Sequence, residues 1–161
     1  GGAPPAAAAA GATVTHVDAS KGMVTWAKEN AVSSGLKDAP IRWLVDDCVK
    51  FVEREIRRGN TYDAIIMDPP SYGRGPKGEI WKIEDMIHPL IRLCAKILSK
   101  DALFFLVNSY TTGLAPAVLT YMISTELKSW NGHVDSQEIG LPVTNSGLVL
   151  PCGASGRWES R

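Results

Sequence analysis

Carboxylates follow three of the hydrophobic runs of this chain, at positions that suit a nucleotide site. They are Asp18, Asp46, Asp47 and Asp68, which come after the runs 13–17, 41–45 and 62–67. Asp18 could accept hydrogen bonds from both hydroxyls of a ribose, and Asp47 could accept one from an adenine amino group. Acidic residues at such positions also cap helices, so each one alone is weak evidence. Together they indicate an adenosine site.

The strongest local signal is the segment Asp68-Pro69-Pro70-Ser71-Tyr72, which directly follows a hydrophobic run. Two prolines fix the backbone and remove two N–H donors, so the carbonyl groups of the segment are rigid and free to accept hydrogen bonds. Tyr72 adds a flat face on which a base could stack. A rigid turn with a packed tyrosine is the simpler alternative. The combination favours a site that holds the amino group of a base.

The elements that must position these residues alternate in type. Short runs rich in β-branched residues alternate with segments of helical period, which predicts an α/β fold with a mostly parallel sheet. We expect strands at 13–17, 41–45, 62–67 and 102–107, helices at 20–34, 48–58, 80–97 and 116–129, and a final antiparallel hairpin at 133–139 and 147–150. Residues 71–78 hold three glycines and a proline and are expected to form a loop, and the alanines at 6–10 a helix. Ligands bind at the carboxyl ends of strands in such sheets.

Composition narrows the class of protein. The chain has 161 residues, seventeen basic and seventeen acidic side chains, and a formal net charge of zero. This balance excludes a long-range electrostatic pull on nucleic acid, so a nucleic-acid contact requires a local patch. No apolar run reaches the ~18 residues that span a bilayer, which predicts a cytoplasmic protein. The three cysteines are far apart and the histidines lack metal spacing, so we expect reduced thiols and no metal.

The quoted motifs resemble those of a known family. The runs Thr15 to Ser20, Asp46-Asp47 and Tyr62 to Glu79 are similar to class I S-adenosylmethionine-dependent methyltransferases. More narrowly, they resemble the bacterial family of large-subunit 23S rRNA cytosine-C5 and guanine-N7 methyltransferases. The resemblance implies a Rossmann-like sheet, S-adenosylmethionine as cofactor, and ribosomal RNA as substrate.

The resemblance also implies roles for single residues. Gly1 and Gly2 match the glycine loop under the methionine part of the cofactor, Asp18 the ribose-binding acid, and Asp47 with the backbone of Cys48 the adenine site. Further residues that it places at the cofactor are Ala19, Ser20, Asp46 and Asp68. The catalytic loop corresponds to Asp68, Pro69, Pro70 and Tyr72, and the residues expected to contact the substrate are Ser71, Tyr72, Arg74 and Lys77.

The expected target atom follows from the absence of a thiol where the resemblance places one. Methylation at carbon-5 of cytosine needs a thiolate that adds to the ring, and the members of the resembled family that do this carry a cysteine beside the Asp-Pro loop or after the next strand. Those places hold Ser71 and the run Asn108-Ser109-Tyr110. Cys152 is a remaining candidate, although a plain buried thiol is the simpler interpretation. We therefore expect methyl transfer to a nitrogen of a base.

Two alternatives remain at this point. A nicotinamide-dependent oxidoreductase shares the glycine turn and the ribose acid but gives the Asp-Pro-Pro segment no role. The chain also begins Gly1-Gly2 without a methionine, so we expect residues 1–161 to form a single methyltransferase domain that lacks its first, central strand. A catalytically inactive remnant that binds a partner is the second alternative.

The basic side chains have two possible interpretations. Arg74 and Lys77 could clamp RNA phosphates or could form an ordinary solvated loop, while Arg54, Arg57 and Arg58 suit a solvated helix face.

Overall fold

The computed structural model describes residues 13–18, 21–35, 41–69, 72–74, 78, 80–110 and 113–161. The chain divides into two compact units, residues 1–55 and 56–161, which are described one at a time. In the described part of the chain, no helix is long and apolar enough to cross a membrane.

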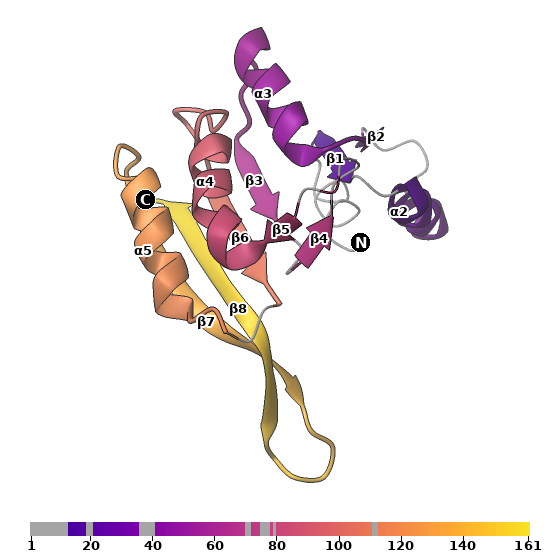
Figure 1. Ribbon diagram of the computed structural model, residues 1–161, viewed down its shortest axis with the longest axis vertical. Helices are drawn as coiled ribbons and strands as arrows, with labels where there is room; N and C mark the ends of the chain where they lie inside the picture. Colours follow the sequence, from indigo (N-terminus) through magenta and orange to yellow (C-terminus); the bar gives the residue numbers. More distant parts are fainter. Residues whose placement is uncertain are drawn as a thin grey trace. The chain divides into compact units, whose positions relative to one another are not determined.

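The first unit contains two parallel strands and their flanking helices (Figure 1). β1 (Val14–Asp18) pairs in parallel with β2 (Ile41–Val45), so Asp18 lies opposite Val45 at the carboxyl edge. Helix α2 (Lys21–Ser33) packs on both strands through Val24, Ala27 and Ala31, and Gly35 follows it with a φ of +76°. That left-handed conformation suits glycine, which ends the helix where the sequence predicts. Helix α3 (Cys48–Arg58) begins in this unit, and its last turn belongs to the second.

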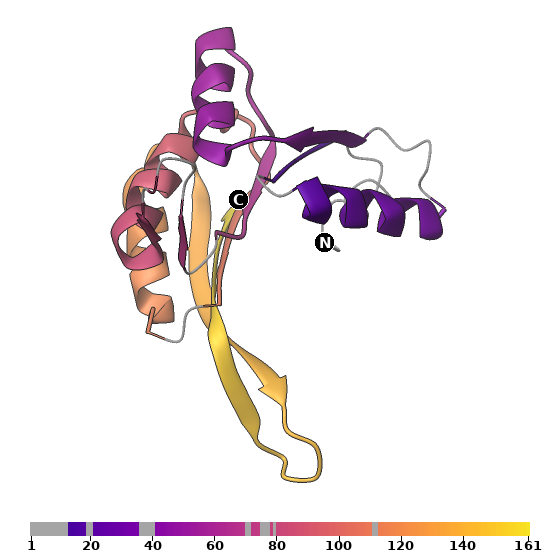
Figure 2. The same cartoon turned by 45° about the vertical axis from the view of Figure 1, so that its right-hand side comes forward.

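The second unit is built on a four-stranded sheet in the order β3-β6-β8-β7. β3 (Ala64–Met67) and β6 (Phe104–Ser109) are parallel, whereas β8 (Val149–Ser160) and β7 (Gly132–Pro142) run antiparallel to their neighbours. Helices α4 (Ile83–Ala95) and α5 (Pro116–Glu126) lie on the same face of this sheet (Figure 2). The order places β6 in the interior of the sheet, in agreement with its apolar sequence.

The core of this unit lies between β6, β8 and the two helices. Along β6, Phe105, Val107 and Ser109 are buried while the intervening residues are partly exposed, which is the period-two pattern of a strand. The helices contribute side chains of α4 and α5 that are less than 2% exposed, and these are Ile83, Ile87, Ile91, Leu119 and Ile123. Burial of one such side chain stabilises the fold by ~1.5–3 kcal/mol.

Three expectations about the second unit are wrong. Residues 71–78 are not only a loop, because β4 (Tyr72–Arg74) pairs antiparallel with β5 (Ile80–Lys82). That hairpin takes Ile80 out of the predicted helix 80–97, so α4 begins at Ile83; it ends at Ala95 and contains Pro89. The last strand continues from Val149 to Ser160 rather than ending at Leu150, because its second half pairs with β6 as well as with β7.

Candidate cofactor and catalytic sites

The structure describes only part of the predicted site. Seven predicted site residues lie outside the described residues, and so does the predicted helix at 6–10. These seven are Gly1, Gly2, Ala19, Ser20, Pro70, Ser71 and Lys77. Tyr72 and Arg74 are described as parts of β4 through their backbone. Asp18, Asp46, Asp47 and Cys48 lie in the first unit, and Asp68 and Pro69 lie in the second.

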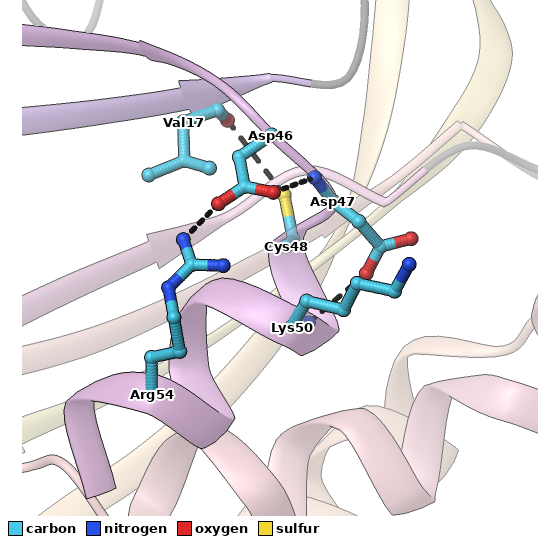
Figure 3. Close-up of polar contacts among 6 residues, drawn as sticks. All are labelled: Val17, Asp46, Asp47, Cys48, Lys50 and Arg54. Atoms are coloured by element: carbon cyan, nitrogen blue, oxygen red, sulfur yellow. Dashed lines mark hydrogen bonds and ion pairs between the residues drawn. The ribbon is translucent and has the colours of Figure 1, made fainter. Parts of the chain in front are cut away.

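In the first unit, the turn between β2 and α3 is organised by its own carboxylates (Figure 3). One oxygen of Asp46 accepts the backbone N–H of Asp47 at 2.8 Å, and the other accepts a guanidinium N–H of Arg54. Asp47 Oδ1 accepts the backbone N–H of Lys50 at 3.0 Å. Asp47 is therefore the N-cap of α3, where a carboxylate satisfies an N–H that has no partner within the helix.

The same turn is fastened to the end of β1. The backbone N–H of Asp46 donates to the carbonyl oxygen of Asp18 at 2.9 Å, and the Cys48 thiol donates to the carbonyl oxygen of Val17 at 3.7 Å. The ends of the two parallel strands thus form one rigid edge that carries Asp18, Asp46 and Asp47. Asp18 and Asp47 therefore lie at the carboxyl ends of two neighbouring parallel strands.

The pKa values of two groups at this edge are shifted in opposite directions. The hydrogen bond from Arg54 holds the pKa of Asp46 below its ordinary value. By contrast, the pKa of the Cys48 thiol is raised to about 11, because of desolvation around the sulfur and because of the carboxylates of Asp18, Asp47 and Asp46. A thiolate is disfavoured there. Cys48 can therefore offer a ligand its backbone, but its sulfur is a poor nucleophile at neutral pH.

We expect Cys48 to react slowly with iodoacetamide although the residue is exposed. With a pKa of about 11, only about 0.1% of the thiol is ionised at pH 8, roughly a hundredfold less than for an unperturbed cysteine. Mass spectrometry of the Cys48 peptide should show an alkylation rate that rises about tenfold per pH unit up to pH 10. Asp47→Asn should increase the rate at pH 8, whereas a plateau near pH 8.5 in the unaltered chain would contradict the prediction.

The structure gives two residues of the first unit, Arg54 and His16, contacts that the sequence did not predict. Arg54, predicted to belong to a solvated helix face, instead pairs with Asp46. The signal was its place eight residues after Asp46, since positions eight apart lie near the same face of a helix. His16 lies in β1 with its ring 5.4 Å from that of Trp43 in an edge-on arrangement. Its Nε2 is buried with no hydrogen-bond partner among the described residues, and burial lowers its pKa.

In the second unit, Asp68 follows β3 directly at the carboxyl edge of the sheet. Met67 pairs with Val107, so β3 ends beside a part of β6 that continues to Ser109. Asp68 is open to solvent and Pro69 is buried, which fixes the start of the loop. Although the residue is exposed, desolvation of its carboxyl group raises the pKa of Asp68 above its ordinary value. An aspartate in this position can accept a hydrogen bond from a ligand amino group.

In the second unit, neither the polar residues at the end of β6 nor the described cysteines are placed as activated nucleophiles. Asn108 Oδ1 accepts the hydroxyl of Ser155 at 2.9 Å, and Ser109 is fully buried. Cys152 lies within β8, where its thiol donates to the carbonyl oxygen of Ile139 at 3.4 Å, and Cys94 is buried in α4. Among the described residues, no group of three histidine, cysteine or acidic side chains is arranged to hold a metal ion.

Solved structures of methyltransferases share this fold. The SAM-dependent methyltransferase from Agrobacterium tumefaciens is 41% identical in sequence and superposes with a TM-score of 0.88 over 96% of this chain and 51% of its own. A methyltransferase solved in complex with SAH (S-adenosylhomocysteine) superposes with a TM-score of 0.66 at 21% identity, over 89% of this chain and 38% of its own. The second likeness concerns the fold alone. The prediction of a Rossmann-like methyltransferase sheet is confirmed.

Curated relatives lead to the same group of enzymes. Ribosomal RNA large subunit methyltransferase K/L of Pseudoalteromonas atlantica is 36% identical over 87 residues, which is 53% of this chain and 12% of that protein. Ribosomal RNA large subunit methyltransferase K of Neisseria meningitidis is 28% identical over 105 residues, 65% of this chain and 30% of that protein. No protein-family model matches the chain.

The chain thus spans about half the length of the Agrobacterium enzyme and a smaller share of the curated relatives. Over nearly its whole length the chain resembles part of a class I S-adenosylmethionine-dependent methyltransferase, and the resemblance predicted from its sequence is confirmed.

Proposed function

We propose that this protein transfers a methyl group from S-adenosylmethionine to a base of ribosomal RNA. The observation that carries the proposal is the 41% identity to a SAM-dependent methyltransferase across 96% of the chain, and the names of the curated relatives support RNA as the substrate. A cytoplasmic location fits that substrate.

In the proposed reaction, the carboxyl ends of β1 and β2 contribute to cofactor binding, and the segment that follows β3 contributes to binding of the base. Asp18 accepts hydrogen bonds from the ribose, and Asp47 with the backbone of Cys48 binds the adenine. The sulfonium of the cofactor supplies an activated methyl group, so the protein has mainly to align the target atom with the methyl carbon and exclude water. Asp68 and the Pro69 carbonyl orient the amino group of the base, and Tyr72 stacks on its ring.

We propose a nitrogen of the base as the acceptor. The position of Cys152 supports that choice, since its thiol donates to the carbonyl oxygen of Ile139 and the residue lies within β8. The test is transfer of a labelled methyl group to in vitro transcribed large-subunit rRNA, followed by mass spectrometry of the nucleosides. A methyl group on a ring or exocyclic nitrogen is expected, whereas 5-methylcytosine would contradict the nitrogen assignment but not the methyl transfer.

Cofactor binding tests the proposal more directly. We expect calorimetry to detect binding of SAH, and Asp18→Ala to weaken it about 10- to 100-fold, because hydrogen bonds to a charged group are worth about 1.5–3 kcal/mol. Glu29→Ala on the exposed surface of α2 is the matched control and should leave the affinity unchanged. Failure to bind SAH, or preferential binding of a nicotinamide dinucleotide, would overturn the proposal.

A further inference from the structure

The Arg54 guanidinium lies at the base of the turn between β2 and α3 and is engaged with one of its carboxylates. It donates to the Asp46 oxygen that the backbone N–H of Asp47 does not use. Asp46 thereby has both oxygens engaged within the protein, as Figure 3 shows. A carboxylate with both oxygens engaged in this way stabilises the turn.

This engagement distinguishes Asp46 from Asp47. Asp47 Oδ1 accepts the N–H of Lys50, and the other carboxylate oxygen of Asp47 has no hydrogen-bond partner among the described residues. The Asp46 carboxylate that pairs with Arg54 also accepts the backbone N–H of Asp47. The backbone of Asp47 is therefore linked to Arg54 through the carboxylate of Asp46.

The charges around the turn explain why a cation is needed there. The carboxylates of Asp18, Asp46 and Asp47 all act on the Cys48 thiol, so the three negative groups lie close together. Like charges at such a site repel each other. Arg54 neutralises Asp46, and its planar guanidinium fixes the direction of the bond as a lysine would not.

We propose that Arg54 is a positioning residue for cofactor recognition, which holds the Asp46-Asp47 turn so that Asp47 accepts a hydrogen bond from the adenine amino group. This inference rests on the proposed function. It assigns Asp46, predicted from the sequence to contact the cofactor, to the support of the turn instead. Specificity for adenine then depends on a side chain that does not touch the cofactor.

The test compares two ligands that differ at one group. S-Inosylhomocysteine carries a carbonyl oxygen where SAH carries the adenine amino group, so it lacks the exocyclic donor that Asp47 is proposed to accept from. We expect the unaltered chain to bind SAH at least tenfold more tightly, and Arg54→Met to reduce that ratio to below about threefold, mainly through weaker binding of SAH. Arg54→Lys should retain part of the ratio. Arg57→Met, an exposed arginine on the same helix, is the control and should retain all of it.

The outcomes separate this inference from the proposed function. If the unaltered chain binds SAH and the ratio is unchanged in Arg54→Met, the positioning role is wrong while the proposed function stands. If both ligands weaken equally, Arg54 serves general stability and the inference is also overturned. If the unaltered chain does not bind SAH, the proposed function fails and the inference fails with it.

Discussion

Replacing Gly153 with alanine is expected to lower the free energy of unfolding by about 3 kcal/mol, because the new methyl group has no space. Gly153 lies in β8 against the end of β6, where an added Cβ would overlap the carbonyl oxygen of Ser109 and come within 2.8 Å of the Tyr110 Cα. These are backbone atoms, so no side chain can rotate away. The pairing of Ala154 with Ser109 would have to break.

Two other glycines calibrate this prediction. At Gly156 an added Cβ would lie 2.8 Å from Ile123 Cδ1 and 2.9 Å from Leu119 Cβ, and the flexible end of an isoleucine can move, so a loss of about 1–2 kcal/mol is expected. Gly113 has no atom within 4 Å of the added Cβ, and its replacement by alanine should leave stability unchanged or slightly raised. Urea denaturation of the three variants measures the series. Equal losses at Gly153 and Gly113 would contradict the packing described for β6 and β8.

The same glycine shows why the last strand could not be predicted in full. The segment 153–156 reads Gly-Ala-Ser-Gly and lacks the β-branched and aromatic residues that mark a strand. These small residues are needed because Ser109 on one strand and Leu119 on a helix approach the backbone closely. That requirement is a property of tertiary packing, and a single sequence carries no local sign of it.

Where the local signals agree, the sequence is a better guide. Helix α3 begins at Cys48 and ends at Arg58, as predicted, because an N-cap aspartate, an apolar stripe and Gly59 with a φ of +72° all act on the same segment. The β4–β5 hairpin was missed because its glycines and proline are typical of a loop. The Asp46–Arg54 pair was missed because arginines on an amphipathic helix are usually solvated.

Replacing Asp68 with asparagine is expected to reduce the rate of methyl transfer by about 10²-fold or more, the loss that follows removal of one well-placed polar group from a reaction site. In the proposed reaction the carboxylate accepts a hydrogen bond from the base and aligns its nitrogen with the methyl group. The measurement is single-turnover transfer to the rRNA transcript by the full-length gene product. Binding of SAH, measured in parallel, should change much less than the rate.

The raised pKa of Asp68 predicts the direction in which the rate of methyl transfer changes with pH. Desolvation of the carboxyl group raises the pKa of Asp68, and the ionised form is the acceptor. The rate should therefore fall as the pH is lowered through that raised pKa, above the ordinary value of about 3.9 for aspartate, and Asp68→Asn should lack this acid limb. An acid limb that persists in Asp68→Asn would assign the titration to another group.

The Asp68→Asn variant should be less active than the unaltered protein but at least as stable. A carboxyl group whose pKa is higher in the folded than in the unfolded protein destabilises the fold at neutral pH, so Asp68→Asn should melt at the same temperature or higher. The matched control is Asp63→Asn, just before the same strand, where an amide oxygen can still accept the hydroxyl of Ser99 now bound at 2.7 Å. It should preserve both rate and stability. Loss of activity together with loss of stability at Asp68 would instead mean that the carboxylate supports the fold.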